Sequence, residues 1–257
     1  MSTETALITG ASAGIGRELA RLFAKDGSNL VLVARRRDRL EELAAELRTH
    51  NGIEVRVLAA DLGRSDAPQA IADALGRDGV AIDVLVNNAG FGALGMFASL
   101  DADRQMEMIQ VNVAALTHLT RLLLPGMIQR RRGGVLNVAS TAGFQAGPFL
   151  AVYYATKAYV ISLSEALHDE LAGEGVAVTC LCPGPTVTEF AATAKMEKSR
   201  MFSLRPMTAE KVAQIGYSGF RRGKLLVIPG WLNYLAATGA RLGPRSIART
   251  IARWLNQ

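Results

Sequence analysis

The stretch TALITGASAGIGRELARLFAKDG, residues 5–27, contains a complete strand–loop–helix unit. The apolar run TALIT predicts a buried strand, and the apolar spacing of GRELARLFAKDG predicts a helix that stops at a glycine. Between them, Gly10, Gly14 and Gly16 allow a sharp turn and let the backbone approach a ligand without a Cβ in the way. A helix that begins after such a loop directs free N–H groups and the positive end of its dipole at an anion.

Two incompatible hypotheses fit this loop. From Gly10 to Gly14 the sequence is G-x-S-x-G, the pattern around the nucleophile of many serine hydrolases, and Ser12 would be that nucleophile. From Gly10 to Gly16 it is G-x-x-x-G-x-G, a loop that can hold the phosphates of a dinucleotide. The hydrolase hypothesis is weaker, because no earlier loop precedes the strand to complete an oxyanion hole. Its candidate base, His168, has the spacing of an exposed helical face.

Short runs rich in Val, Ile and Leu recur along the chain and alternate with helical patterns. They are continuously apolar rather than alternating, which is typical of parallel strands covered on both faces. We therefore predict an α/β domain with a doubly wound, parallel, seven-stranded sheet and helices on both faces, a Rossmann fold. The expected strands are 5–9, 29–34, 54–60, 82–87, 134–140, 176–182 and 224–228, and the expected helices are 16–27, 36–52, 65–79, 101–129 and 151–172.

The length of 257 residues suffices for one such domain without a second. We assign 1–182 to the cofactor-binding and catalytic core. The long connection 183–206 starts at the carboxyl edge of the sheet, where this fold binds ligands, and is expected to be a substrate loop. After a helix capped by Thr208, 231–257 forms a helical extension of two basic amphipathic helices split at Gly243-Pro244. We expect this extension to pack on the domain or on a second subunit in preference to a membrane surface.

Composition narrows the class of protein further. The net charge of +6 comes from short arginine runs without the stacking aromatics or recognition helix of a nucleic-acid-binding protein, so nucleic acid is not an expected partner. The N-terminus lacks a basic n-region, and no stretch is continuously apolar over the length of a membrane span. Cys180 and Cys182 are expected as buried hydrophobes, and the scattered histidines predict no metal site. These features favour a cytoplasmic protein with reduced thiols.

The end of the second predicted strand bears on cofactor choice. Its sequence VLVARRR places Ala34 and then Arg35 where NAD-binding folds carry an acid for the ribose 2′-hydroxyl. An arginine at this position suits a 2′-phosphate, through a bidentate charge-assisted pair. Cations beside the positive end of a helix are unfavourable unless an anion lies there. The sequence therefore favours NADP(H) over NAD(H).

The strongest catalytic constellation lies in VASTAGFQAGPFLAVYYATKAYV, residues 138–160. Tyr153 and Lys157 are four residues apart at the start of a predicted helix, so both side chains lie on one face. Ser140 ends the preceding strand at the carboxyl edge of the sheet. The lysine ammonium is expected to lower the tyrosine pKa from about 10, while the serine hydrogen-bonds a substrate oxygen. This arrangement suits interconversion of a carbonyl and an alcohol with hydride from a nicotinamide, whereas Tyr154 is expected to pack.

These motifs, in this order, resemble the short-chain dehydrogenase/reductase family of the single-domain kind, from residue 5 to about residue 228. NNAG at 87–90 resembles the family's adenine-side motif, and PGPTVT at 183–188 resembles the segment that closes over the nicotinamide. The resemblance implies that Asn112 holds a proton-relay water from a kinked helix and that Asp61 contacts the adenine. It implies Asn112, Ser140, Tyr153 and Lys157 as catalytic residues. The implied cofactor-binding residues are Gly10, Ser12, Gly14, Ile15, Gly16, Arg35, Asp61, Leu62, Asn88, Ala89, Gly90, Tyr153, Lys157, Pro183, Gly184, Thr186 and Thr188.

The resemblance implies an NADP(H)-dependent oxidoreductase that interconverts a ketone or aldehyde and an alcohol, in a homo-oligomer. Ser12 would add a hydroxyl to the 2′-phosphate site, whereas Ala13 stands where some NADP-preferring members carry a second basic residue. The alternative function is a catalytically silent, dinucleotide-binding regulatory protein of the same fold. The intact Ser140–Tyr153–Lys157 set favours the enzyme, because a binding protein has no need of all three.

The substrate pocket is expected to follow the motifs, at Phe91, Gly92, 144–150 and the loop 186–206. Most of these side chains are apolar, which favours an apolar small-molecule substrate. The residues expected to make the pocket apolar are Phe144, Pro148, Phe149, Leu150, Phe190, Met196, Met201 and Phe202.

Overall fold

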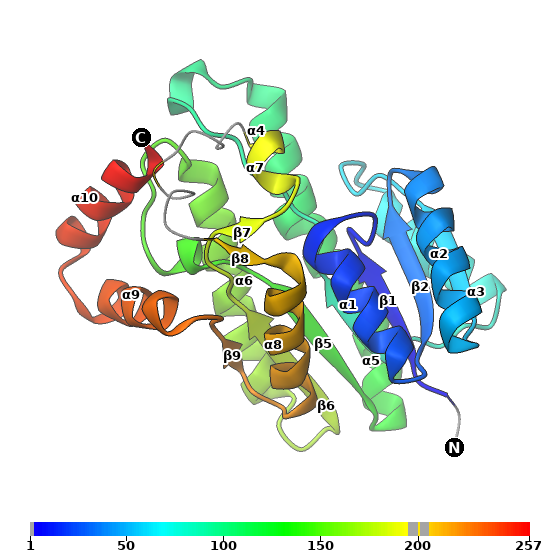
Figure 1. Ribbon diagram of the computed structural model, residues 1–257. Coiled ribbons are helices and arrows are strands. Elements are labelled where there is room, and N and C mark those ends of the chain that lie inside the picture. Colours follow the sequence, from blue (N-terminus) through cyan, green and yellow to red (C-terminus); the bar gives the residue numbers. More distant parts are fainter. Residues whose placement is uncertain (1–2, 195–199, 201–205) are drawn as a thin grey trace.

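The computed structural model describes residues 3–194, 200 and 206–257. Seven parallel strands form one sheet in the order β3-β2-β1-β4-β5-β6-β9, and helices cover both of its faces (Figure 1). The predicted doubly wound fold is thus confirmed. The strands are β1 (Thr5–Thr9), β2 (Asn29–Ala34), β3 (Val55–Ala59), β4 (Val84–Asn87), β5 (Gly133–Val138), β6 (Val176–Leu181) and β9 (Leu226–Val227).

The continuous apolar runs of the strands serve two cores, one on each face of the sheet. In β1, Ile8 points into one core and Leu7 into the other, as the alternation of side chains along a strand requires. The first core is closed by α1 (Gly14–Lys25), α2 (Arg37–Asn51) and α8 (Ala209–Arg221). The second is closed by α3 (Ala67–Arg77), α5 (Leu116–Arg130) and the C-terminal end of α6 (Ala151–Glu170). This double burial explains why the strands lack a polar face.

The helix predicted at 101–129 is divided. It consists of α4 (Ala102–Ile109), a π-helical segment η2 (Gln110–Ala115) and α5. Contrary to the sequence prediction, the stretch Ala102–Arg130 is long and apolar enough to cross a membrane by length and composition. In the fold, Leu119 and Met127 of this stretch are fully buried in the second core, so one face of the stretch packs against the sheet.

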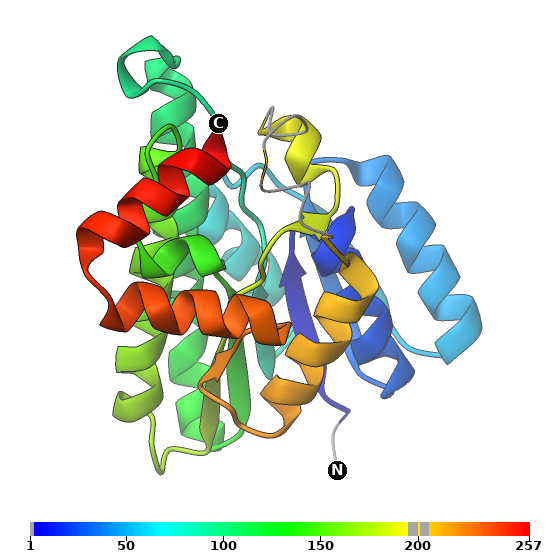
Figure 2. The same ribbon diagram turned by 60° about the vertical axis from the view of Figure 1, so that its left-hand side comes forward.

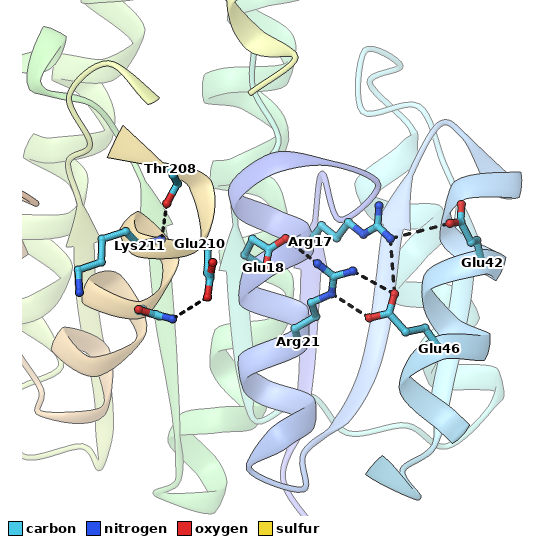
Figure 3. A network of polar contacts seen from close by, with 9 residues as sticks. Arg17, Glu18, Arg21, Glu42, Glu46, Thr208, Glu210 and Lys211 are labelled. Carbon is cyan, nitrogen blue, oxygen red and sulfur yellow. Dashed lines mark hydrogen bonds and ion pairs between the residues drawn. The ribbon is translucent and has the colours of Figure 1, made fainter. Parts of the chain in front are cut away.

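Ion pairs fix α1 to α2, as Figure 3 shows. Arg21 of α1 donates to both carboxylate oxygens of Glu46 on α2, at 2.9 and 3.0 Å, and Arg17 approaches the same carboxylate at 3.5 Å. The hydrogen bonds from Arg21 hold the pKa of Glu46 below its usual range. Partly exposed pairs of this kind contribute about 1 kcal/mol or less to stability. Their main effect is positional, because the N-terminal ends of both helices flank the glycine loop and the arginine run.

The C-terminal residues form α9 (Trp231–Leu242) and α10 (Arg245–Asn256), split at Gly243-Pro244 as predicted. The two helices lie as an outer layer at one end of the molecule (Figure 2). Near the end of α10, the buried Asn256 donates to the carbonyl of Pro148 at 2.8 Å and accepts from the Tyr154 hydroxyl at 3.3 Å. The extension therefore packs on its own domain, next to the helix that carries Tyr153.

The connection after β6 contains a small parallel pair, β7 (Thr186–Val187) with β8 (Met207–Thr208), and a short helix α7 (Phe190–Thr193). Thr208 caps α8, as predicted, because its side chain accepts from the backbone N–H of Lys211 at 3.2 Å. Of the residues predicted for the substrate loop, Met196, Met201 and Phe202 lie outside the described residues.

Candidate active site

The glycine positions of the loop after β1 have no room for side chains. Gly10 and Gly14 adopt φ values of +66° and +54°, in the left-handed region that favours glycine. A Cβ on Gly16 would lie 2.4 Å from the Asn88 Nδ2 atom and 2.5 Å from the Gly10 carbonyl oxygen. Asn88 in turn donates to the Thr9 carbonyl at 2.9 Å, so Gly16 allows the loop to pack on the segment after β4.

Replacing Gly16 with alanine is expected to weaken NADPH binding by about tenfold or more, which corresponds to about 1.4 kcal/mol. The added methyl group would displace Asn88 and thus the loop that faces the cofactor. Fluorescence titration with NADPH measures the effect. Gly76→Ala is the matched control, since a Cβ there meets nothing within 4 Å. Equal affinities in the two variants would show that this packing has no part in cofactor binding.

A cavity of about 1200 Å³ runs along the carboxyl edge of the sheet, between the loops that follow the strands. Its size and its position fit a dinucleotide together with a substrate. Of the predicted cofactor residues, Gly16 alone does not line it, because it lies behind the loop. The residues that do line it are Gly10, Ser12, Gly14, Ile15, Arg35, Asp61, Leu62, Asn88, Ala89, Gly90, Tyr153, Lys157, Pro183, Gly184, Thr186 and Thr188.

Two arginines, not one, face the end of the cavity beside α1. Arg36 donates to the Ser12 hydroxyl at 3.2 Å and pairs with Glu189 at 2.8 Å. Arg35, the residue predicted from the sequence, lies 3.5 Å from a carboxylate oxygen of Glu107. Arg36 was not among the predicted cofactor-binding residues, although it belongs to the same arginine run. Two guanidinium groups and a hydroxyl beside a helix N-terminus form a site suited to a phosphate.

Asp61 lies on the same side of the cavity. Its carboxylate accepts from the backbone N–H of Gly63 at 3.0 Å and does not cap α3, which begins at Ala67. It is exposed, so the carboxylate remains accessible from the cavity.

Ser140, Tyr153 and Lys157 meet at the middle of the cavity wall. Ser140 follows β5 and caps the short helix η3 (Thr141–Phe144), where its hydroxyl oxygen accepts from the N–H of Ala142 at 3.1 Å. The Ser140 hydroxyl donates to the Pro183 carbonyl at 3.3 Å, and its proximity to the Tyr153 hydroxyl acts to lower the pKa of Tyr153. On α6, Lys157 donates to the carbonyl of Val138 at 2.8 Å and lies 5.8 Å from the centre of the Tyr153 ring. The side chains of Tyr153 and Lys157 are both buried.

The pKa values correct one sequence prediction. Burial raises the pKa of Tyr153 above its ordinary value, and the nearby Ser140 hydroxyl only partly offsets this effect. Burial also lowers the pKa of Lys157 to about 8. The lowering of the Tyr153 pKa expected from lysine is therefore not found, because burial determines the direction of the shift. Near neutral pH the pair consists of a phenol and an ammonium group, which suits proton donation.

Replacing Lys157 with methionine is expected to raise the free energy of unfolding near pH 7. The pKa of Lys157 is about 8 in the folded protein and about 10.5 in the unfolded protein. Below about pH 8 the folded protein therefore contains a buried positive charge that lowers its stability. Between about pH 8 and about pH 10.5 the lysine is protonated in the unfolded state and largely neutral in the folded state. The wild-type protein therefore gains stability relative to the variant as the pH rises through this range. Urea unfolding of both proteins across this range measures the difference. A pH-independent difference would contradict a lowered pKa.

Asn112 lies in the π-helical segment and is buried behind the cavity wall. Its amide donates to the Phe91 carbonyl at 3.0 Å and accepts from the Phe91 N–H at 3.1 Å, and it also donates to Thr156 on α6 at 3.1 Å. The irregularity expected from the resemblance takes the form of this π-helical segment. The side chain, however, joins the loop after β4 to α6 and does not line the cavity.

The substrate end of the cavity differs from the sequence prediction. Phe91, Leu150 and Phe190 line it as expected, and Tyr154, which was expected only to pack, lines it too. Phe144 and Pro148 line a smaller neighbouring cavity instead. Gly92 and Phe149 line neither of the two. Unpredicted wall residues come from α9, α10 and the turn before them: Gly230, Trp231, Leu232, Asn233, Ala236, Ala237 and Leu255.

The structure does not bring His168 to Ser12. His168 is half-buried near the end of α6, not solvated as predicted, and its Nδ1 atom lies 3.0 Å from the Val178 carbonyl in the first half of β6. Ser12 lies beyond the opposite, carboxyl end of β1. The hydrolase hypothesis thus loses its base. Cys180 and Cys182 are free and buried, as predicted.

Comparison with known proteins agrees with the family resemblance seen in the sequence motifs. The family model for short chain dehydrogenases matches residues 4–199. The chain belongs to the short-chain dehydrogenase family. Very-long-chain 3-oxoacyl-CoA reductase from Anas platyrhynchos is 36% identical over 195 residues, which are 74% of this chain and 62% of that protein, so the match spans less than two thirds of the relative's length.

Two solved structures extend the comparison to the fold. A short-chain dehydrogenase from Sphingobium yanoikuyae in complex with NADPH is 36% identical, has a TM-score of 0.84, and covers 93% of each chain. The bulky-bulky ketone specific alcohol dehydrogenase from Comamonas testosteroni is 32% identical, with a TM-score of 0.79 over 94% of this chain and 93% of that one. The family model ends at residue 199, whereas both structural alignments extend into the C-terminal part of this short-chain dehydrogenase.

Proposed function

We propose that this short-chain dehydrogenase is an NADP(H)-dependent oxidoreductase that interconverts a ketone or aldehyde and an alcohol. The observation that carries the proposal is the convergence of Ser140, Tyr153 and Lys157 on one cavity wall. The glycine loop lines the same cavity, so a dinucleotide cofactor and a substrate can both be bound there. A nicotinamide dinucleotide bound there supplies the hydride that reduces the carbonyl carbon.

The preference for NADP(H) rests on Arg35 and Arg36. Similar solved structures include complexes with NADPH and with NAD, so the family alone does not decide the cofactor. Arg36 and Ser12 are hydrogen-bonded to each other, and Arg35 lines the same region of the cavity. NAD-binding folds carry an acid at the end of the second strand that binds the ribose 2′-hydroxyl, and this chain has Arg35 there. A 2′-phosphate would replace Glu107 and Glu189 as the partner of these guanidinium groups.

In the reduction direction Tyr153 acts as the acid. Its raised pKa keeps the phenol protonated near neutral pH, ready to donate to the carbonyl oxygen as that oxygen gains negative charge. Ser140 holds the same oxygen by a hydrogen bond. After the proton leaves, the O–H bond of the alcohol has formed and the buried phenolate is stabilised by the ammonium group of Lys157 and the hydroxyl of Ser140. In the oxidation direction the phenolate takes the proton back.

An apolar carbonyl compound is the substrate class that this cavity favours. Phe91, Leu150 and Phe190 from the core of the fold, together with Trp231 and Leu232, present apolar side chains to the same cavity as the catalytic residues. Similar proteins named for bulky ketones and for very-long-chain 3-oxoacyl-CoA agree with a large apolar substrate. A cytoplasmic location and a homo-oligomeric assembly remain proposals from the sequence.

A panel of ketones, aldehydes and alcohols assayed with NADPH, NADP⁺, NADH and NAD⁺ tests the proposal. We expect oxidation of NADPH with bulky apolar ketones and weaker or no turnover with NADH. Absence of turnover with every compound, together with tight NADPH binding, would instead support the silent regulatory protein.

A further inference from the structure

A second, smaller cavity lies between α6 and α10. Its volume is about 380 Å³, at the lower end of the range of small-molecule sites, about 300–1000 Å³. We call it the α10 cavity; it is lined by residues 143–148, by Ala151, Tyr154, Ala155 and Ala158 of α6, and by Arg245 and Arg249 of α10.

Small residues on the α6 side leave this space open. Ala151, Ala155 and Ala158 lie along one exposed face of α6, and each has a single carbon beyond the backbone. In the preceding loop, Gly147 lies against the ring of Tyr154, where a Cβ would come within 2.4 Å of three ring atoms. The resulting walls are mostly apolar.

The α10 side of the cavity is cationic. Arg245 and Arg249 are one helical turn apart, so both reach the same space. Neither forms an ion pair with a carboxylate in the part of the chain that the structure describes, and residues 231–257 contain no aspartate or glutamate. Glu165 of α6 is already paired with Arg241, at 3.6 Å. Two like charges at this spacing repel each other, and an anion between them removes the repulsion.

We propose that the α10 cavity binds an organic acid, a compound with an apolar body and one anionic group. The body would contact the alanines of α6, and the anionic group would accept hydrogen bonds from the Arg245 and Arg249 guanidinium groups. An inorganic anion is a poorer occupant because it leaves the apolar walls unfilled. A neutral apolar compound leaves both cations without a partner.

The α10 cavity shares a wall with the catalytic cavity. Gln145 and Tyr154 line both of them. The Tyr154 hydroxyl donates to Asn256 at 3.3 Å, and the Asn256 amide donates at 2.8 Å to the carbonyl of Pro148, which lines the α10 cavity. An occupant therefore contacts the same tyrosine as the substrate, and we expect it to change KM for a ketone. This coupling rests on the proposed function, whereas the binding of an organic acid does not depend on it.

Isothermal titration calorimetry of the full chain with octanoate tests the binding. Octanamide has the same shape without the charge, and acetate has the charge without the apolar body. We expect octanoate to bind about tenfold or more tightly than either of them. Equal affinity for octanoate and octanamide would overturn the proposal.

Removing the cations tests where octanoate binds, because the larger catalytic cavity also has apolar walls. Arg245→Gln/Arg249→Gln is expected to weaken octanoate binding about tenfold or more. Arg77→Gln/Arg222→Gln is the charge-matched control, at exposed arginines that line neither of the two cavities, and is expected to leave the affinity unchanged. Equal affinities in the two variants would contradict the assignment of the site.

Filling the cavity tests its apolar part without changing any charge. Ala158→Leu places a larger side chain in the cavity from an exposed helical position and is expected to weaken octanoate binding about tenfold or more. Ala70→Leu, at an exposed alanine of α3 that lines neither cavity, is the matched control. Circular dichroism verifies that each variant is folded. Unchanged affinity in Ala158→Leu would show that octanoate binds elsewhere.

Sedimentation velocity tests a second copy of the chain as the occupant. A dimer that Ala158→Leu disrupts, and that binds no octanoate, would replace the organic acid with a second copy. A single species whose size is the same with and without octanoate supports the proposal.

Steady-state kinetics with NADPH and a bulky apolar ketone test the coupling. Octanoate is expected to change KM for the ketone about fivefold or more in the wild type and to have no such effect in Arg245→Gln/Arg249→Gln. An equal effect in that variant would place the acid in the catalytic cavity and contradict the proposal. An unchanged KM in the wild type at saturating octanoate would exclude the coupling. Calorimetry needs no turnover, so a failure of the proposed function does not alter the binding test.

Discussion

Replacing Tyr153 with phenylalanine is expected to lower kcat for carbonyl reduction by about 10²–10⁴-fold, the usual contribution of a positioned acid. The substitution removes the proton donor and leaves the aromatic ring, which packs at 5.3 Å from Phe190 and lies beside Lys157. The dissociation constant for NADPH is expected to change by less than about threefold, because the glycine loop and the arginines are untouched. NADPH consumption under saturating ketone gives kcat, and fluorescence titration gives the dissociation constant.

The neighbouring tyrosine provides the control. Tyr154→Phe removes a hydroxyl that bonds Asn256 and is expected to retain most of the activity, since that hydroxyl anchors α10. If Tyr153→Phe turned over ketone as fast as the wild type, the assignment of the acid would be wrong. A loss of activity in Tyr154→Phe equal to that in Tyr153→Phe would equally contradict a specific role for Tyr153.

Replacing Arg35 with aspartate is expected to invert the cofactor preference. The variant loses a charge-assisted contact worth about 1.5–3 kcal/mol and adds a repulsive carboxylate, so NADPH affinity should fall by about 10- to 100-fold or more. NADH, which lacks the 2′-phosphate, should bind as well or better, since aspartate accepts from the ribose 2′-hydroxyl. Arg36→Gln is expected to lower NADPH affinity by a smaller factor, because it removes a cation without adding an anion. The ratio of kcat/KM for the two cofactors measures the preference.

Arg37→Asp is the matched control within the same run. Arg37 pairs with Glu41 on α2 and does not line the cavity, so its replacement changes the net charge equally without touching the phosphate site. An unaltered cofactor preference in Arg35→Asp, or an equal change in Arg37→Asp, would refute the assignment of the 2′-phosphate site.

The sheet and the catalytic set could be predicted because local signals fix them. Strands buried on both faces need continuous apolar runs, and the positive φ at Gly10 and Gly14 needs glycine. Tyr153 and Lys157 share a face because they are four residues apart on a helix, and Ser140 reaches them because parallel strands end at one edge. These relations depend on spacing and topology alone.

Other features depend on tertiary packing that spacing does not encode. The amphipathic patterns of α9 and α10 indicate two helices but not which of their faces meets the cavity, so Trp231, Leu232 and Leu255 could not be assigned. The direction of the Tyr153 pKa depends on how completely the ring is buried, which a lysine four residues away does not reveal. Arg36 was missed because a side chain that follows a strand can turn either way, and its contact with Ser12 joins residues 24 positions apart.

Transfer of deuterium from NADPH deuterated at the nicotinamide C4 position tests the central claim most directly. With a bulky apolar ketone, the wild-type protein is expected to place one deuterium on the carbinol carbon for each NADPH oxidised, as mass spectrometry of the alcohol would measure. The Tyr153→Phe protein should bind the same cofactor and form little or no labelled alcohol. Oxidation of NADPH without deuterium in any alcohol product, or equal labelling by the two proteins, would contradict hydride transfer assisted by Tyr153.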